Sequence, residues 1–485
     1  ERRRRRRLVC LVVAEEILNR TGGNTSPATS GQWLEKHRPV DETLLYRVAR
    51  SGAEDVAAAV AAARSAQPAW AERTPVERGN VVRELALRLR ERREEASAIV
   101  VEETGKSLEL ALGETDAAIE MGLFVAGEGR RSYGRTTTAS TPHRTVFTVR
   151  QPLGVAALIM SFNTPLPNVA WKAFPAIFCG NAAIMKPSEH TPASASLFVD
   201  LALEAGVPDG VLNVIHGLGP EAGAPLVEHR GVDLVSFTGS AATGRWINET
   251  AGRRLAKVCL ELGGKNALVV CDDADLDAAM RWALASAFSN AGQRCASASR
   301  LVVLDAVYDV FRDRLLEGVR YLEPQPVISR ESLERISEVV ARAVEHGATL
   351  LAGGDRLDRP GWHFAPTVLE EAAPTAEISR SELFGPVTVL YRAADLDEAI
   401  ALVNDSPYGL TAAIHTASVH RAMRFAERVQ AGVVVVNAGT HGSEAHVGFG
   451  GIKDSGTGWR EAGVEALDVY SDLKVVNLVA YPNNA

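Results

Sequence analysis

Four apolar runs between residues 154 and 237 constrain the fold of this chain more than any other feature. They cover residues 154–160, 182–185, 212–216 and 234–237. A near-continuous apolar run of this kind is typical of a strand covered on both faces, as in a parallel sheet. A loop and a helical pattern separate each run from the next. We therefore predict a doubly wound parallel sheet, which binds ligands at the C-terminal ends of its strands.

Polar residues follow two of these runs at the expected edge of the sheet. Lys186 and Glu189 come directly after the second run, where an ammonium and a carboxylate can hold ribose hydroxyls. Gly239 and Ser240 follow the fourth run and open a helix whose free N–H groups favour a phosphate. Taken singly, the first pair also fits a surface ion pair, and the glycine also fits a tight turn. No GxGxxG sequence follows any of the runs, which argues against the standard pyrophosphate turn.

Residues 257–300 contain two side chains that suit a single reaction. Glu261 lies between two leucines and is followed by a pair of glycines. A carboxylate in apolar surroundings has a raised pKa and can act as a base near neutral pH. Cys295 lies among small and polar residues, where an accessible nucleophile is expected. Taken alone, such a cysteine is more often a small buried residue, and such a glutamate is more often a solvated turn residue.

Together, the glutamate motif and the Gly-Gln-Arg-Cys sequence at residues 292–295 resemble the two signatures of the aldehyde dehydrogenase superfamily. The resemblance runs from about residue 41 to about residue 476. It implies that Cys295 is the nucleophile, that Glu261 activates water and that Asn163 donates to the oxyanion. It also implies that a nicotinamide cofactor is bound by residues at the strand ends and in the segment 382–386, namely Lys186, Glu189, Gly239, Ser240, Glu382 and Phe384.

The resemblance further implies an α/β, aldehyde dehydrogenase-like fold in three parts. A cofactor-binding domain with the doubly wound sheet would contain residues 31–130 and 151–258, and a second α/β domain, the catalytic one, would contain residues 259–464. A β arm of residues 131–150 and 465–485 would join subunits in a homodimer or homotetramer.

Periodicity predicts helices over residues 53–71, 75–104 and 108–127, and a buried strand over residues 433–436. Residues 1–30 are predicted to be a disordered N-terminal extension. Its arginine run and the apolar residues 8–14 imitate a secretory signal, but the apolar part is short and no Ala-x-Ala site is evident.

The implied reaction oxidises an aldehyde to a carboxylic acid through a thiohemiacetal and a thioester on Cys295. The polar setting of the thiol, the cofactor ring or Glu261 would promote the thiolate. The presence of Glu261 favours release of the acyl group to water. Glu461 matches a further glutamate of the family, although a solvated salt bridge explains it equally well. A carboxylate at Glu189 would repel a 2′-phosphate, so NAD is preferred and NADP is the alternative.

The substrate is left open by the sequence. Arg294, beside the nucleophile, favours a semialdehyde that carries a carboxylate, whereas apolar candidates for tunnel walls favour an aldehyde with an apolar tail: Phe162, Trp171, Phe288 and Phe449. A catalytically silent binding protein on the same fold would lack the nucleophile, base or oxyanion donor. A thiol-dependent hydrolase would need a histidine partner and no cofactor site.

Two details depart from the family pattern. Gly448 replaces the proline of the Pro-Phe-Gly-Gly-x-Lys motif, which leaves the rigidity of Phe449 in question. The loop 321–329 is shorter than its family counterpart and lacks a Gly-Asp-Pro turn.

Charge and cysteine content exclude several other classes of protein. The net charge is −8, from 52 basic and 60 acidic residues, so a nucleic-acid or anionic-membrane surface is not expected. The five cysteines are never spaced as CxxC, which argues for a reducing compartment, here the cytoplasm, and against a zinc site. The cluster of His441, Glu444 and His446 lies in a glycine-rich loop without metal-ligand spacing, so we expect no metal.

Overall fold

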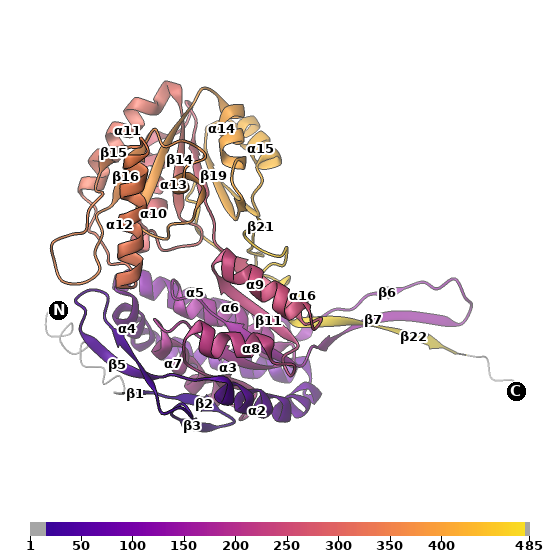
Figure 1. Ribbon diagram of the computed structural model, residues 1–485. Helices are drawn as coiled ribbons and strands as arrows, with labels where there is room; N and C mark the ends of the chain where they lie inside the picture. The colour runs from indigo at the N-terminus through magenta and orange to yellow at the C-terminus, as the bar shows by residue number, and fades with distance from the viewer. Residues whose placement is uncertain (1–15, 481–485) are drawn as a thin grey trace, which may run out of the picture.

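The first of two large sheets is built around the four predicted apolar runs. The protein is described here by a computed structural model that covers residues 16–480 (Figure 1). The first sheet has seven strands, and five consecutive ones, from the edge strand β12 to β10, are parallel, as predicted. In spatial order the strands are β12 (Lys257–Leu262), β11 (Leu234–Gly239), β8 (Val155–Ile159), β9 (Ala182–Lys186), β10 (Leu212–Val214), β2 (Asn19–Thr21) and β3 (Asn24–Ser26).

Helices cover both faces of this sheet, because alternate residues of each strand point to opposite sides. Along β8, Ala156 and Leu158 face one hydrophobic cluster, whereas Val155, Ala157 and Ile159 face the other. The first cluster packs beneath α3 (Pro75–Glu91), α4 (Arg93–Thr104), α5 (Leu108–Gly127), α6 (Pro165–Phe178) and α7 (Pro192–Glu204). The opposite face is covered by α2 (Ala53–Glu72), α8 (Ala224–Glu228) and α9 (Ala241–Gly252).

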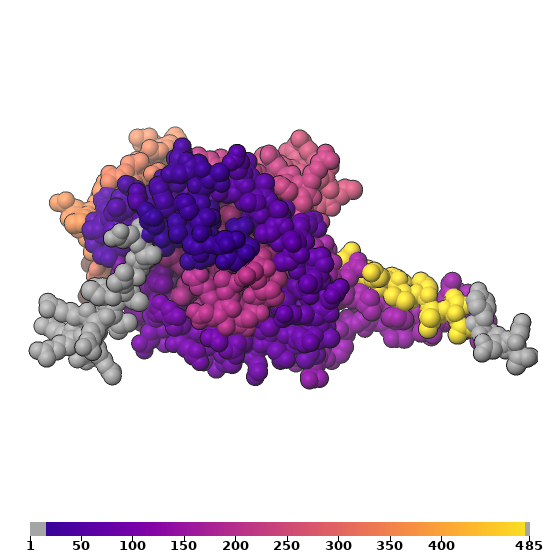
Figure 2. Space-filling view, turned by 90° about the horizontal axis from the view of Figure 1, so that it is seen from below, coloured from indigo at the N-terminus to yellow at the C-terminus, as the bar shows by residue number. Residues whose placement is uncertain are grey.

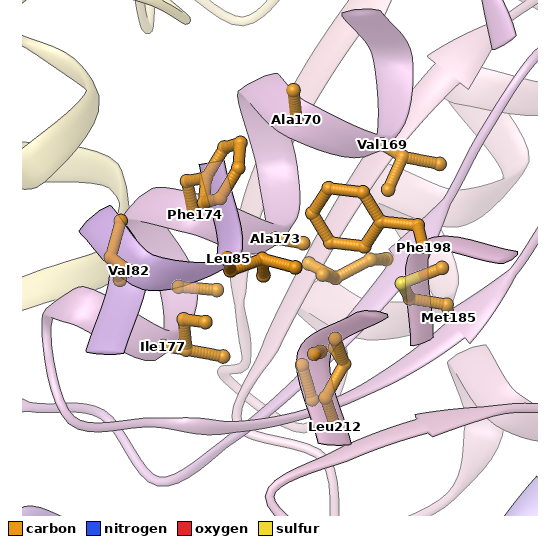
Figure 3. Packing of buried hydrophobic residues seen from close by; sticks show 14 of the residues in the cluster. Val82, Leu85, Val169, Ala170, Ala173, Phe174, Ile177, Met185, Phe198 and Leu212 are labelled. Atoms are coloured by element: carbon orange, nitrogen blue, oxygen red, sulfur yellow. The ribbon is translucent and has the colours of Figure 1, made fainter. Parts of the chain in front are cut away.

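Figure 3 shows the core between the sheet and the first group of helices. Phe174 of α6 and Phe198 of α7 meet edge to face, with ring centroids 5.2 Å apart. Leu85 of α3 and Met185 of β9 lie in the same cluster. This packing holds α6 rigidly against β8 and β9, and the loop before α6 carries Asn163.

The second sheet also has seven strands and forms a separate layer, drawn in the upper part of Figure 1. Its order is β15 (Thr349–Ala352), β16 (Thr367–Glu370), β17 (Val387–Ala393), β14 (Ala298–Leu304), β13 (Asn266–Val270), β19 (Thr411–His415) and β20 (Val433–Val436). Its helices are α10 (Leu276–Phe288), α11 (Asp305–Arg320), α12 (Arg330–Glu345), α13 (Glu377–Arg380), α14 (Leu396–Asn404) and α15 (Val419–Arg428). All strand pairs are parallel except β15 with β16.

A narrow β arm extends from the body of the molecule (Figures 1 and 2). It pairs β7 (Arg144–Pro152) with β22 (Ser471–Val479) in antiparallel register, from Ser471 opposite Pro152 to Val479 opposite Arg144, and β6 (Thr136–Thr137) flanks β7. The two segments predicted to pair therefore do so. The second segment begins at Ser471 rather than at residue 465, because α16 (Ala466–Tyr470) packs on α6 instead.

The prediction of a disordered extension is wrong for residues 16–30. Arg20 of β2 pairs with Val214 of β10, and β3 completes the hairpin, so this segment extends the first sheet. A further sheet joins β1 (Glu16–Ile17), β5 (Leu44–Ala49) and β4 (Trp33–His37). The predicted extension over residues 1–15 lies outside the described residues.

Three other expectations need correction. The helix expected over residues 75–104 is two helices, α3 and α4, which meet at Arg92. The predicted boundary at residue 259 falls inside β12, so Glu261 lies on a strand of the first sheet. Strand β20 is not buried: it is the edge strand of the second sheet, and Val436 is 43% exposed.

The remaining short elements are β18 (Tyr408–Gly409), β21 (Ile452–Lys453), η1 (Glu128–Arg130), η2 (Gly219–Gly223) and η3 (Ser289–Gly292). Within residues 16–480, no helix is long and apolar enough to cross a membrane.

Candidate active site

A cavity of about 670 Å³ lies where the loops of the two sheets meet. It is lined by the C-terminal ends of β11 and β12, by the loop between β8 and α6, and by the segment before β14. This cavity brings together seven of the nine predicted site residues: Asn163, Gly239, Ser240, Glu261, Cys295, Glu382 and Phe384. Glu189 lines a different cavity of about 430 Å³, and Lys186 is buried at the end of β9.

Cys295 lies between η3 and β14 and follows a tight left-handed turn within η3. Asn290 and Ala291 have φ values of 55° and 52°, and Gly292 has 66°. The carbonyl of Cys295 accepts a hydrogen bond of 2.7 Å from Asn266 Nδ2 on β13, which fixes the backbone of the turn. Among the four cysteines within residues 16–480, only Cys295 is partly exposed. The cysteine that the sequence singles out is therefore the partly exposed one in this part of the chain.

The polar setting of Cys295 does not by itself favour the thiolate. Burial, and after it the carboxylates of Glu382 and Glu261, raise the pKa of Cys295 to about 12. Arg294 lowers the pKa, but its effect is smaller. The thiol is consequently protonated in this arrangement, and it needs a base or an added positive charge before it can react.

Glu261 lies near the end of β12 with its carboxylate enclosed. The residue is 6% exposed, and neither of its carboxylate oxygens has a hydrogen-bond partner within residues 16–480. Burial raises the pKa of Glu261 well above its ordinary value, and the charge of Glu461 raises it further. A Cβ atom at Gly450 would lie 2.7 Å from Glu261 Oε1, so only glycine leaves room for the carboxylate. The raised proton affinity expected from the sequence is therefore present.

A second buried carboxylate lies behind Glu261. Glu461, which is 2% exposed, forms an ion pair with Lys172 of α6 and accepts a 2.9 Å hydrogen bond from Ser236 Oγ. The alternative of a solvated salt bridge for Glu461 is wrong, since both partners are buried. Lys172 was not identified from the sequence. The available signal was that it is the only charged residue in the apolar helix α6.

The Glu461→Gln variant should move the pH dependence of Glu261. Removal of the Glu461 charge lowers the pKa of Glu261, because it removes a repulsive carboxylate and leaves Lys172 without its partner. The sequence predicts that Glu261 is the base that activates water, which requires its ionised form, so the acidic limb of the deacylation rate should shift to lower pH. Stopped-flow measurement of acyl-enzyme decay against pH tests this. An acidic limb that stays at the same pH, or moves to higher pH, would contradict the electrostatic coupling of Glu461 to Glu261. The Glu461→Asp variant, which keeps the negative charge, is the matched control.

Asn163 lies in the loop between β8 and α6 with its side chain 6% exposed. Asn168 Nδ2 donates a 3.1 Å hydrogen bond to Asn163 Oδ1. The side-chain oxygen of Asn163 is therefore occupied, and its NH₂ group is the part left to donate into the cavity. Asn168, on the first turns of α6, was not identified from the sequence, because an asparagine in a helix carries no signal of its partner.

The residues at the strand ends fit a nicotinamide dinucleotide. Ser240 caps α9 and accepts from Thr243 N at 3.3 Å, which leaves other first-turn N–H groups of α9 available to an anion. Lys186 Nζ lies 3.6 Å from Glu189, so this pair is formed and remains able to hold hydroxyl groups.

Glu382 is held against the glycine pair that follows Glu261. Its carboxylate accepts a 3.1 Å hydrogen bond from Gly264 N, and a Cβ atom at Gly263 would collide with it. Burial raises the pKa of Glu382 to about 7. Nearby, Phe384 meets Phe162 edge to face, with ring centroids 5.6 Å apart. Gly263 is thus required by the close approach of Glu382, whereas a Cβ atom at Gly264 would lie 2.6 Å from Asn266 Oδ1 and 2.9 Å from the carbonyl oxygen of Cys295.

Aromatic side chains form part of the wall of the 670 Å³ cavity. Trp171 and Phe449 are in contact, with ring centroids 5.4 Å apart, and both line the cavity with Phe162. Phe288 does not: it lines another cavity, of about 310 Å³, so that prediction is wrong. Phe449 is held without the family proline, because its N–H and carbonyl pair with the backbone of Glu461 at 2.6 and 2.8 Å.

Arg294 and His441 also line this cavity. The Nε of Arg294 has no hydrogen-bond partner within residues 16–480. Burial lowers the pKa of His441 to about 4, and the guanidinium of Arg294 lowers it further, so His441 is neutral beside a positive group. Within the same part of the chain, no cluster of histidine, cysteine, aspartate or glutamate could hold a metal ion.

Comparisons with known proteins agree with this geometry. The model of the aldehyde dehydrogenase family matches residues 26–476. Alpha-ketoglutaric semialdehyde dehydrogenase of Bacillus subtilis is 35% identical over 96% of this chain and 99% of its own length. The NADP(+) succinate-semialdehyde dehydrogenase GabD of Escherichia coli is 36% identical over 93% of this chain and 95% of its own. The structure of betaine aldehyde dehydrogenase from Staphylococcus aureus in complex with NAD+ superposes with a TM-score of 0.96 at 32% identity, covering 99% of this chain and 98% of that one.

Proposed function

The chain belongs to the aldehyde dehydrogenase family and oxidises aldehydes with NAD(P), and on this premise we propose that the oxidation proceeds through a thioester on Cys295 to a free carboxylic acid. The observation that carries the proposal is a convergence. Cys295, Glu261 and Asn163 come from three distant segments, and all line one cavity. A nucleophile, a base and an oxyanion donor are the three groups that acyl transfer requires.

In the proposed mechanism, the Cys295 sulfur attacks the aldehyde carbon as the thiol proton passes to solvent, and Glu261, whose pKa burial raises, is the base for the later hydrolysis. The Asn163 NH₂ group and the backbone N–H of Cys295 donate to the oxygen as it becomes negative. Bound NAD(P) supplies the acceptor for the hydride that leaves the substrate carbon. Glu261 then takes a proton from water, and the water oxygen attacks the thioester carbon. The C–S bond breaks, the leaving sulfur takes that proton from Glu261, and the acid is released with the thiol and the ionised carboxylate restored.

The direct test is a panel of aldehydes with NAD and with NADP. Reduced cofactor should appear together with one carboxylic acid per turnover, without coenzyme A. The carboxylate of Glu189 supports faster reaction with NAD, because it would repel a 2′-phosphate. Absence of reduction with every aldehyde, or product formation only with coenzyme A, would overturn the proposal.

A second proposal concerns the substrate, which we infer to be an aldehyde that carries a carboxylate. Arg294 supports it, since this residue lines the cavity next to the nucleophile and its Nε has no hydrogen-bond partner among residues 16–480. A guanidinium can bind a carboxylate through two parallel hydrogen bonds. Two of the relatives are semialdehyde dehydrogenases, which is consistent with this substrate class.

The Arg294→Leu variant separates the two substrate classes. Loss of a hydrogen-bonded charge pair should lower kcat/KM for succinic semialdehyde by about 10- to 100-fold. Butanal has the same chain length and no carboxylate, so its kcat/KM should stay within about 3-fold. Steady-state kinetics with both aldehydes measure the ratio. An equal loss for both substrates would show that Arg294 acts on the nucleophile loop rather than on a substrate carboxylate.

We also infer that the arm joins subunits in a homodimer or homotetramer and that the protein is cytoplasmic. Several apolar side chains of the arm are exposed to solvent in the single chain: Leu473, Val475 and Leu478 are 52%, 59% and 58% exposed. Four free cysteines support a reducing compartment. Light scattering on the purified chain measures the number of subunits.

A further inference from the structure

A buried ion pair lies beside the cavity and has no part in the mechanism above. Lys106 Nζ lies 2.6 Å from Glu114 Oε1, and the two side chains are 0% and 7% exposed. Lys106 comes just after α4, which ends at Gly105 with a left-handed φ of 73°, and Glu114 lies on α5. Burial lowers the pKa of Lys106, while the carboxylate of Glu114 opposes that shift and favours the charged form.

The ammonium of Lys106 also reaches the loop that carries Asn163. Lys106 Nζ donates a 2.8 Å hydrogen bond to the backbone carbonyl of Asn163. This carbonyl belongs to the residue whose side-chain NH₂ faces the cavity. A fixed carbonyl fixes the orientation of the adjoining peptide and, with it, the origin of the Asn163 side chain.

The same carbonyl accepts a second hydrogen bond from the other domain. Asn290 Nδ2 donates to Asn163 O at 3.2 Å and to Gln293 O at 3.2 Å, two residues before Cys295. Asn290 has a left-handed backbone, which asparagine tolerates better than most residues. One buried carbonyl therefore connects the oxyanion loop, the nucleophile loop and the Lys106–Glu114 pair.

We propose that Lys106, kept charged by Glu114, is a positioning residue that sets the distance between the Asn163 donor and Cys295. The inference rests on the proposed role of Asn163 in the reaction. A displacement of about 1 Å between reacting groups can cost about 10²-fold in rate. A cation on the Asn163 carbonyl prevents such a displacement, because a buried ammonium cannot easily leave its two oxygen partners.

The variant that tests this removes both charges at once. In Lys106→Met/Glu114→Met, no unpaired charge remains buried, so the chain should fold. The kcat for aldehyde oxidation should fall about 10- to 100-fold. The Kd for NAD and the rate of Cys295 alkylation by iodoacetamide should remain within about 3-fold, since neither needs the Asn163 donor. The control is Arg78→Met: Arg78 is another buried cation that donates to a backbone carbonyl, that of Phe178 at 2.7 Å, and it does not line the cavity.

A double-mutant cycle with Asn163→Ala decides between positioning and a purely structural role. If Lys106 acts through Asn163, the loss of kcat caused by the paired variant should disappear in the Asn163→Ala background. Equal losses in both backgrounds, or a kcat loss in Arg78→Met of the same size, would overturn the positioning role. A normal kcat in Asn163→Ala alone would overturn the oxyanion role in the proposed function, which is a separate result.

Discussion

Replacement of Cys295 by serine should lower the kcat for aldehyde oxidation by at least about 10⁴-fold. A serine hydroxyl is a far weaker nucleophile than a thiolate. Burial and the carboxylates of Glu382 and Glu261, which together raise the pKa of the thiol to about 12, would disfavour an alkoxide even more strongly. Formation of reduced cofactor with any active aldehyde measures the loss.

Cofactor binding shows whether the Cys295→Ser variant is inactive because it lacks the nucleophile or because it is misfolded. The Kd of NAD, measured by calorimetry, should remain unchanged, because serine is nearly isosteric with cysteine. Cys179→Ser is a matched control, since Cys179 is buried in the first domain and does not line the cavity. Appreciable turnover by Cys295→Ser would mean that another group attacks the aldehyde.

The Glu261→Gln variant should complete one oxidation per site and then stop. Glutamine keeps the shape of the side chain but cannot take a proton from water, so the acyl group should remain on Cys295. General-base catalysis typically contributes about 10²- to 10⁴-fold, and the steady-state rate should fall by that factor. Because the pKa of Glu261 is raised by burial, the wild-type rate should also decline as pH falls and the base becomes protonated.

Two measurements identify the stalled species. Rapid mixing should show a burst of reduced cofactor equal to the number of sites, and mass spectrometry of the quenched protein should show the acyl group on Cys295. Steady turnover at the wild-type rate would remove Glu261 from the role of base. If the variant shows a burst of normal size at every pH but turns over at the normal rate only at high pH, hydroxide replaces the water that Glu261 activates.

Several elements were predictable because their signals are local. The continuous apolar runs around Ala157 and Ile184 identify strands buried on both faces, and the sheet contains them. Helix α5 was predicted with its observed ends, since Ser107 accepts from Leu110 N as an N-cap. The hairpin of residues 19–26 was missed. Its polar sequence resembles a linker, and only the exposed edge of β10 gives it a place to pair.

Local patterns in the sequence are enough to predict the class of the fold and the candidates for the reactive groups. Apolar periodicity and the motifs around Glu261 and Cys295 are recognised from neighbouring residues, without knowledge of distant contacts. The electrostatic behaviour of these groups, in contrast, depends on residues that only folding brings close. The pKa values of Cys295 and Glu261 depend on burial and on Glu382 and Glu461, which come from other segments. The hydrogen bond from Lys106 to Asn163 joins segments that are distant in the sequence, and no periodic pattern of residues predicts it. Electrostatic energy depends on the distance between two groups in space and not on their separation along the chain.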